Sequence, residues 1–310
     1  MFVTGSISMH DRFMELQQMR YVIAVAETNS FTRAAERCLV VQSALSHQVA
    51  RLERELGGKL FERTSRRVRL TPAGEAFLPA ARQCLDAAER AAAEVAAALG
   101  EVRGRLTVGV IPTVAAVDIP AALHEFRSRY PNVRIGLRVG ASEELVEQVR
   151  DGVLDVACLG LPATIQPRGV HTRVTARDRL VAVVAPGHPL AGEPEVDLRR
   201  LSAEVFVDFP LGSAGRAQSD QAFAAAGLDR DIAFEVPAPD LMVRIVRRGL
   251  GIAMLASTYV PQLTGVHTIE VSDAPARIEY LAWNDVGPTP AAKAFLEIAG
   301  VPAHDLADRS

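Results

Sequence analysis

The sequence predicts an α/β protein in which a small helical N-terminal module, a long helix and a larger alternating part follow one another. Three observations support this fold class. Short helical patterns occupy residues 16–56, one long helical pattern covers residues 72–102, and strands alternate with helices from residue 104 onwards. A chain of 310 residues is also long enough for two or more domains with buried cores.

The composition is that of an ordinary globular protein. Hydrophobic residues make up 49% and charged residues 23% of the chain, and the formal net charge is −3. No apolar run approaches the ~20 residues of a membrane span, and the N-terminus lacks a signal-peptide pattern. We expect a cytoplasmic protein with no membrane partner. Residues 1–13, MFVTGSISMHDRF, are expected to be a disordered extension or the product of an upstream translation start.

Residues 14–71 have the pattern of three short helices followed by a hairpin. The first helix has an apolar face formed by Leu16, Met19, Val22, Ile23 and Ala26. Ser30 or Thr32 can cap a second helix over RAAERCL, and a third runs from about Ser43 to Leu56, where LGG stops it. KLFER and RRVRL then form two short strands. This order of elements predicts a winged helix-turn-helix, a plan that binds DNA.

The charge of this segment agrees with a DNA partner. Residues 14–71 hold ten Arg and Lys against six Glu, a surplus of four in a chain that is acidic overall. Small polar side chains on the third helix suit the major groove, about 12 Å wide, and wing arginines such as Arg69 suit phosphates. In isolation Gln42 and Ser46 would be solvated surface residues, and His47 is either a base contact or a surface residue. The candidate DNA-binding residues are Ser30, Thr32, Arg33, Gln42, Ser43, Ser46, His47, Arg51, Arg63, Arg66 and Arg67.

Residues 72–102 predict a linker helix that pairs with a second copy. Thr71 suits the N-cap and Pro72 the first helical position, whereas Pro79 should kink the helix. Apolar residues step by four and three alternately from Phe77 to Val102, which is the spacing of a heptad seam. A single buried helix would also show such a stripe, but little of its own domain is available to cover this one. The candidate dimerisation residues are Leu85, Ala88, Ala92, Val95 and Leu99.

From residue 104 the chain alternates strands with helices, which predicts parallel α/β sheets. The predicted strands are RLTVGVI, VRIGLRVG, LDVACLG, DRLVAVVA, EVFVDF, IAFEVP, LGIAMLA and RIEYLAWN. Ligands of open α/β sheets bind beyond the carboxyl ends of strands, where helix N-termini gather. The hydroxyls and free amides at Thr113 and Ser142 would form an anion site, unless both residues are only helix caps. The candidate effector-binding residues are Thr113, Ser142, Gly160, Leu161, Phe209, Pro210 and Asp240.

The same half of the chain lacks the motifs of common enzymes. GLGIAM, residues 249–254, begins like a dinucleotide fingerprint, but Met254 replaces the third glycine and the motif follows a helix. No GxxxxGKS, HExxH or GxSxG occurs, and the cysteines and histidines show no metal-ligand spacing. His188, in GHPLA, fits a turn. We therefore predict no catalytic residue, no metal and no cofactor.

The stretch SFTRAAERCLVVQSALSHQVARLERELGGKLFERTSRRVRLTPAGEAFL closely resembles the N-terminal signature of LysR-type transcriptional regulators. The resemblance implies a winged helix-turn-helix, a long linker helix and a two-lobed, periplasmic-binding-protein-like α/β effector domain. It implies lobe I at residues 103–177 and 276–310 and lobe II at residues 178–275. It also implies double-stranded promoter or operator DNA, a small-molecule effector that is often a carboxylate, a homodimer or homotetramer, and RNA polymerase as a further candidate partner.

Two positions depart from the family pattern. Val41 stands where Ser or Thr is usual, so a helix cap and a phosphate contact are missing, and His47 stands where Arg is common. The sequence specificity is therefore less well defined than DNA binding itself.

The three cysteines, Cys38, Cys84 and Cys158, are expected to be reduced thiols. None lies in lobe II, where peroxide-sensing members of the family carry a cysteine pair, so we do not expect a thiol-pair sensor. The leading prediction is a ligand-responsive transcriptional regulator. The alternatives are an α/β enzyme with an appended DNA-binding module and an architectural DNA binder whose second half only oligomerises.

Overall fold

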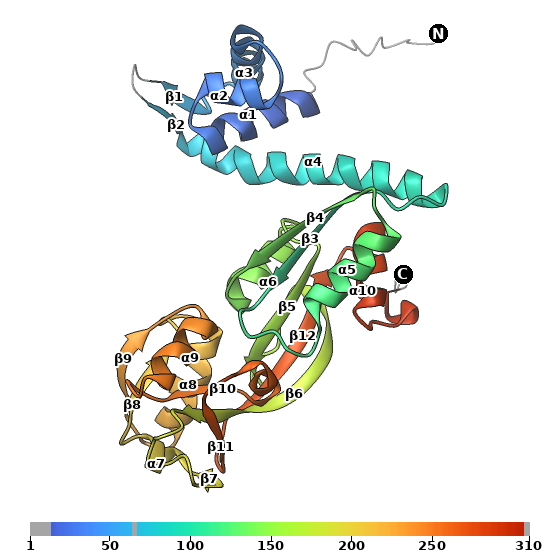
Figure 1. Cartoon of the computed structure of the whole chain (residues 1–310). Helices are drawn as coiled ribbons and strands as arrows, with labels where there is room; N and C mark the ends of the chain where they lie inside the picture. Colours follow the sequence, from blue (N-terminus) through green and yellow to red (C-terminus); the bar gives the residue numbers. More distant parts are fainter. Residues whose placement is uncertain (1–13, 64–66, 307–310) are drawn as a thin grey trace, which may run out of the picture. The chain divides into compact units, whose positions relative to one another are not determined.

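The computed structural model describes residues 14–63 and 67–306. It separates into two compact units, Met1–Ala92 and Ala93–Ser310 (Figure 1). The predicted disordered extension, residues 1–13, lies outside the described residues. Each unit has its own hydrophobic core, so each is described by itself.

The first unit is the predicted winged helix-turn-helix. It contains α1 (Leu16–Thr28), α2 (Phe31–Arg37) and α3 (Gln42–Leu56), and then the antiparallel strands β1 (Phe61–Arg63) and β2 (Val68–Leu70). α3 ends because Gly57 adopts a left-handed conformation at φ 72°, which glycine reaches without a steric penalty. The core is small, and its fully buried members include Val22, Val25, Ala34, Leu45, Val49, Leu52 and Leu60.

A buried carboxylate joins the hairpin to α3. Glu53 is only 3% exposed, and its Oε1 accepts hydrogen bonds from the backbone amides of Leu60, at 3.0 Å, and Phe61, at 3.3 Å. Its Oε2 accepts from Lys59 Nζ at 2.8 Å. Because each carboxylate oxygen has a donor, burial of this charge is compensated and the start of β1 is fixed against α3.

α4 (Pro72–Ala98) is the predicted linker helix. Thr71 Oγ1 accepts from the amide of Gly74 at 3.0 Å, in agreement with the predicted N-cap. The helix ends earlier than expected, since Gly100 takes φ 84° and the amide of Glu101 returns to the carbonyl of Ala96. Leu99 therefore follows the helix rather than lying within it, and Val102 packs on the core of the second unit.

The second unit contains an eight-stranded sheet. Its order is β4-β3-β5-β12-β6-β11-β7, and β10 pairs with β6. The strands are β3 (Gly104–Val110), β4 (Val133–Val139), β5 (Val156–Pro162), β6 (Val170–Val184), β7 (Glu195–Val196), β10 (Ala253–Ala256), β11 (His267–Val271) and β12 (Ala276–Asn284). A further parallel pair is formed by β8 (Val205–Asp208) and β9 (Asp231–Glu235).

The prediction of parallel sheets is wrong for part of the main sheet. β3 is parallel to β4 and β5, but β12 is antiparallel to both β5 and β6. β6 also begins at Val170 rather than near Asp178. The prediction missed its first half because VHTRVTARD alternates polar and small residues and lacks the apolar run by which the later half was recognised. β6 pairs with β12 up to Arg179 and with β10 from Leu180, so one continuous strand runs from the first lobe into the second. β12 is the returning strand, which explains its direction.

Helices cover both lobes of this unit (Figure 1). In lobe I, α5 (Ile119–Arg129) packs against α10 (Pro290–Ile298), with the rings of Phe126 and Phe295 5.9 Å apart. α6 (Ser142–Arg150) belongs to a separate lobe I core. Lobe II carries α7 (Leu198–Leu201), α8 (Ala214–Ala225), α9 (Pro239–Arg247) and the 3-10 helix η1 (Ser257–Gln262). The first residue of α8, Ala214, is buried among side chains of lobe I, so the two lobes are in contact.

Candidate functional site

The exposed face of α3 carries most of the predicted DNA-reading residues. Gln42, Ser43 and His47 are exposed and Ser46 is half-buried, whereas Leu45, Val49 and Leu52 on the other face form the core. Arg51 lies on the same outer face, where it contacts Glu55 Oε1 at 2.9 Å and Glu15 Oε1 at 3.4 Å. These side chains can meet a groove without any loss of core packing.

The N-terminus of α2 is capped by one of the predicted residues. Ser30 Oγ accepts from the amide of Arg33 at 3.3 Å, while Thr32 is exposed. The guanidinium of Arg33 donates to the carbonyl of Thr28. α3 has no such cap, because its N-cap residue is Val41, which has no side-chain oxygen. The absence of a side-chain cap on α3, expected from the sequence, is thus confirmed.

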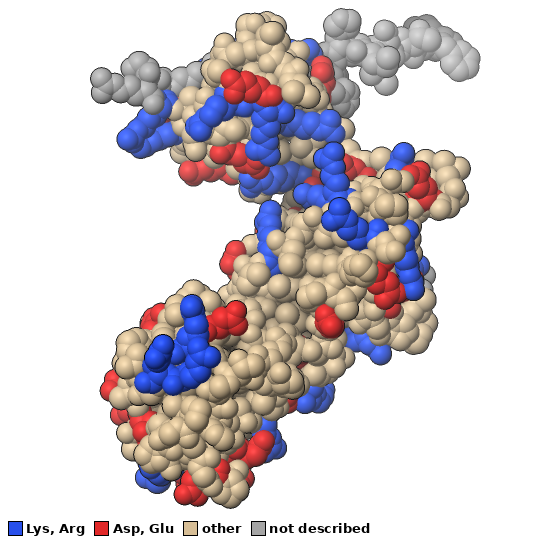
Figure 2. Space-filling view, viewed as in Figure 1, with Lys and Arg blue, Asp and Glu red and all other residues tan. Residues whose placement is uncertain are grey.

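The hairpin places basic residues at the edge of the first unit. Arg67 and Arg69 are exposed, and Arg63 is the last residue of β1. Arg66, also a predicted phosphate contact, lies outside the described residues. A row of Lys and Arg side chains crosses the visible face of this unit, with acidic side chains beside them (Figure 2). Such a surface suits the phosphate backbone of DNA.

A cavity of about 420 Å³ lies between the two lobes of the second unit. We call it the interlobe cavity; its walls include Ile111, Thr113, Val139, Ala141, Ser142 and Gly160 from lobe I and Phe209, Pro210, Leu211, Ser213, Gln218 and Met254 from lobe II. Five of the seven predicted effector-binding residues therefore meet in one cavity. Its size is that of a small organic ligand, and most of its lining is apolar.

Leu161 and Asp240 are not part of this lining. Leu161 is 4% exposed and belongs to a hydrophobic core, because successive residues of a strand point to opposite faces and Gly160 occupies the cavity face. Asp240 is exposed in the first turn of α9. Burial is the main cause that raises the pKa of Tyr259, and the negative charge of Asp240 raises it further. The Asp240 carboxylate therefore influences Tyr259 rather than the cavity.

Ser142 is not a helix cap, which was the alternative to a role in ligand binding. The N-cap of α6 is Ala141, which offers no side-chain acceptor. Ser142 Oγ instead donates to the carbonyl of Gly160 and accepts from the amide of Gly160, both at 3.0 Å. Its single proton is therefore already used, and only the backbone amides of this helix end remain as donors towards the cavity.

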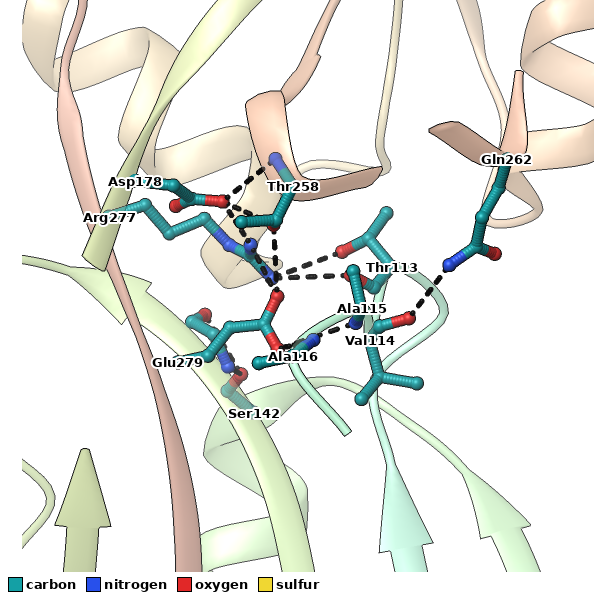
Figure 3. Close-up of polar contacts among 11 residues, drawn as sticks. Thr113, Val114, Ala115, Ala116, Ser142, Asp178, Thr258, Gln262, Arg277 and Glu279 are labelled. Carbon is teal, nitrogen blue, oxygen red and sulfur yellow. Dashed lines mark hydrogen bonds and ion pairs between the residues drawn. The ribbon is translucent and has the colours of Figure 1, made fainter. Parts of the chain in front are cut away.

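Thr113 is not a cap either, since Asp118 caps α5. Its hydroxyl lies 3.4 Å from Nη2 of Arg277, a residue of β12 that the sequence did not identify. Arg277 is 3% exposed and lines the interlobe cavity. Its Nη1 lies 3.2 Å from Asp178 Oδ2 and 2.8 Å from Glu279 Oε1 (Figure 3). We call Asp178, Arg277 and Glu279 the charge cluster.

The carboxylates of the charge cluster have further donors. Thr258 Oγ1 donates to Asp178, and the amides of Ala115 and Ala116 donate to Glu279 Oε2 at 3.4 and 3.1 Å (Figure 3). Thr258 comes from η1 in lobe II, whereas Ala115 and Ala116 follow β3 in lobe I. The cluster thus joins the two lobes at the wall of the cavity.

The start of α8 forms the lobe II wall. Ser213 caps this helix by accepting from the amide of Arg216, and its own hydroxyl proton goes to the carbonyl of Pro210. Gln218 lies one turn further along, is 3% exposed and lines the cavity. Its Nε2 has no hydrogen-bond partner among the described residues. An amide donor buried in this way favours a ligand that brings an acceptor.

Comparison with known proteins agrees with this architecture. Residues 99–300 match the LysR substrate binding domain, and residues 16–75 match the bacterial regulatory helix-turn-helix protein, lysR family. The chain belongs to the LysR family of transcriptional regulators.

This LysR-family chain is similar to curated regulators over most of its length. It is 38% identical to the HTH-type transcriptional regulator ShiR of Corynebacterium glutamicum, over 78% of this chain and 82% of that protein. It is 32% identical to the transcriptional dual regulator GltC of Bacillus subtilis, over 83% and 86%. These relatives are regulators rather than enzymes, as predicted.

Solved structures share the fold of the LysR-family chain. A full-length variant of OxyR from Pseudomonas aeruginosa matches with a TM-score of 0.71 at 25% identity, covering 96% of this chain and 95% of that one. Full-length CbnR complexed with its target DNA matches with a TM-score of 0.68 at 26% identity, covering 92% and 99%. The latter structure holds a LysR-type regulator on DNA.

The predicted dimerisation residues of this LysR-family chain form an incompletely covered stripe. Leu85 and Ala88 are half-buried, whereas Ala92 is exposed, Val95 is 61% exposed and Leu99 is 82% exposed. Apolar side chains of this size are seldom left in water in such a row. The stripe is consistent with a partner helix, and the seam remains a prediction.

The cysteines of the LysR-family chain are unpaired. Cys158 is buried, and its pKa is raised to about 12 mainly by desolvation and to a smaller extent by the negative charge of Glu279. This thiol therefore stays protonated at neutral pH. Within residues 14–63 and 67–306, no group of three or more His, Cys, Asp or Glu is placed to hold a metal ion. In the same residues, no helix combines the length and hydrophobicity needed to cross a membrane.

Proposed function

We propose that this LysR-family regulator is controlled by a small organic anion that binds in the interlobe cavity. The observation that carries the proposal is the origin of the cavity walls, with Thr113 and Gly160 on one lobe and Phe209 and Pro210 on the other. A ligand that touches both lobes favours one arrangement of them over others, and this difference in binding free energy is what an effector requires.

The polar groups at the cavity favour an acceptor on the effector. The hydroxyls of Ser142 and Ser213 already donate to backbone carbonyls, but Gln218 Nε2 has no hydrogen-bond partner among the described residues. The amides of the first turn of α6 add further donors, and the positive end of that helix favours negative charge. The apolar remainder of the lining suits a hydrocarbon body, so a small carboxylate fits best.

For DNA, we propose that α3 reads base edges and the wing contacts phosphates. Gln42, Ser43, Ser46 and His47 supply the polar groups of the reading face, and Arg67 and Arg69 supply charge beside it. Ser30 orients α2 through its cap and so supports the position of α3. A homodimer paired along α4 would present two such faces to two half-sites.

The effector proposal can be tested at Ala141, the uncapped N-cap of α6. Ala141→Asp and Ala141→Asn both supply a capping oxygen, but only Asp adds a negative charge at the cavity. The full-length protein should be titrated with benzoate, phenylacetate and hexanoate, with thermal stability as the readout. We expect acids that stabilise the wild type to stabilise Ala141→Asn as well and to lose their effect on Ala141→Asp.

A promoter reporter provides the functional arm of the same test. An acid that stabilises the protein should change transcription in the wild type and in Ala141→Asn, but not in Ala141→Asp. DNA binding without acid should be equal in all three proteins, since the reading face lies in the other unit. Equal stabilisation of Ala141→Asp and Ala141→Asn by every acid would place the anion elsewhere.

A further inference from the structure

Arg277 is a buried cation whose Nη1 is occupied by ion pairs and whose Nε–Nη2 edge is available for a further hydrogen-bond acceptor. Its side chain is 3% exposed, and Nη1 carries the contacts to Asp178 and Glu279. Within residues 14–63 and 67–306, Nη2 has two long contacts and no shorter one, 3.4 Å to Thr113 Oγ1 and 3.5 Å to Thr113 O. Among the described residues no acceptor hydrogen-bonds to Nε. The Nε–Nη2 edge therefore keeps most of its donor capacity for a partner that comes from the cavity.

Gly160 determines where that edge lies. A Cβ at position 160 would come within 2.4 Å of Nη2 and 2.8 Å of Nε. The absence of a side chain at Gly160 therefore lets the guanidinium approach β5 this closely. Gly160, Thr113 and Arg277 all line the interlobe cavity, so the available edge belongs to its wall.

The charge cluster holds this edge in place. Asp178 accepts from Thr258, and Glu279 accepts from two backbone amides, so neither carboxylate depends on Arg277 alone. Two fixed contacts at Nη1 restrict the rotation of the guanidinium plane. Asp178 and Glu279 are therefore positioning residues for the opposite edge.

We propose that the Nε–Nη2 edge of Arg277 anchors the carboxylate of the effector through two parallel hydrogen bonds. The inference rests on the proposed function and names the group that selects the ligand class. A guanidinium fork matches the two oxygens of a carboxylate in spacing and in plane. Because two carboxylates and one guanidinium already share the site, it favours a singly charged planar acid over a dianion such as phosphate.

The test uses matched acids and amides on the full-length protein. Benzoate, phenylacetate and hexanoate are titrated by calorimetry against benzamide, phenylacetamide and hexanamide. Arg277→Lys keeps the charge and loses the fork. Gly160→Ala keeps Arg277 and its ion-pair partners but inserts a methyl group against the edge. Both variants should lower acid affinity by about tenfold or more and leave amide affinity unchanged.

A direct readout is the Nε–H resonance of Arg277 in arginine-labelled protein, assigned by its loss in Arg277→Lys. Benzoate should shift it and benzamide should not, a response that a purely structural arginine would not give. If Arg277→Lys is poorly folded by circular dichroism, Gly160→Ala decides, because it retains all three residues of the charge cluster and changes only the space beside the edge.

Ala141→Phe, which fills the cavity from lobe I, separates this inference from the proposed function. Loss of acid binding in Ala141→Phe, with wild-type affinity in Arg277→Lys and Gly160→Ala, would keep the cavity as the site and overturn Arg277 as the anchor. Acid binding retained in all three variants would overturn both proposals. A wild type that binds none of the acids, or binds acids and amides equally, would also overturn the anchor.

Discussion

Ser142 Oγ and the backbone of Gly160 exchange two hydrogen bonds of 3.0 Å each, one donated and one accepted. These two bonds join the first residue of α6 to the interior of β5. Ser142 is only 1% exposed, so both bonds are buried. They fix Gly160 at the position over which Arg277 lies. The serine thus shapes the interlobe cavity through the backbone, rather than by offering a free hydroxyl.

Ser142→Ala should lower the free energy of unfolding of the second unit by about 1–3 kcal/mol, because the amide and carbonyl of Gly160 lose their buried partner. Urea denaturation of the full-length protein measures the change. Ser202→Ala is the matched control, since Ser202 Oγ donates to the carbonyl of Arg199 near the surface. A Ser142→Ala variant as stable as the wild type would show that water replaces the hydroxyl.

Val41→Thr should stabilise the first unit by about 1 kcal/mol, because it adds the missing N-cap oxygen to α3 without changing the β-branched shape. Val41 already has the extended conformation of an N-cap, at φ −74° and ψ 143°, and is 69% exposed. Val41→Ala is the control and should show no gain. Thermal denaturation followed by circular dichroism compares the three proteins, and equal midpoints for Val41→Thr and Val41→Ala would rule out a capping effect.

Base reading and phosphate contact should respond differently to mutation. Gln42→Ala should weaken specific DNA binding by roughly 1–3 kcal/mol and hardly change non-specific binding. Arg69→Ala should weaken binding to every sequence and reduce the salt dependence, since fewer counterions are released. Fluorescence anisotropy on an operator and on a scrambled duplex at several salt concentrations separates the two effects. Equal losses on both duplexes for Gln42→Ala would contradict a base-reading role.

The sequence was most informative where function follows local chain geometry. Thr113, Gly160 and Phe209 were identified because each follows or ends a predicted strand, and the structure brings them to one cavity. Arg277 was missed because its importance depends on pairing between β12 and β5, which are far apart in the chain. The early half of β6 was missed for a related reason, since β12 and not an apolar pattern stabilises it. Long-range antiparallel pairing leaves little periodic signal in a single segment.

Cys158 should make stability depend on alkaline pH. Its folded pKa of about 12 lies above the ordinary value of 9.0, so the folded state retains a proton that the unfolded state releases. The resulting stabilisation is complete below pH 9 and is lost as pH rises towards 12. The difference in unfolding free energy between wild type and Cys158→Ala should shrink by about 1.4 kcal/mol per pH unit above 9. Cys84→Ala, at an exposed thiol, should follow the wild type.

Val95→Glu should separate the protein into monomers if α4 is the dimer interface. Val95 is a better site than Leu85, because Leu85 is half-buried and lines a small cavity with Ile23 in the first unit, where substitution would also disturb the fold. A buried glutamate in a helix pair would carry an unpaired charge, whereas in a monomer it is solvated.

Sedimentation velocity measures the assembly of Val95→Glu, and an operator-binding assay measures its consequence. Loss of the second reading face should lower operator affinity by roughly a hundredfold or more, since the two half-sites no longer act together. Ala87→Glu is the matched control, because Ala87 is exposed on the same helix but lies off the seam. A Val95→Glu protein that sediments as the wild type does would move the dimer interface away from this stripe.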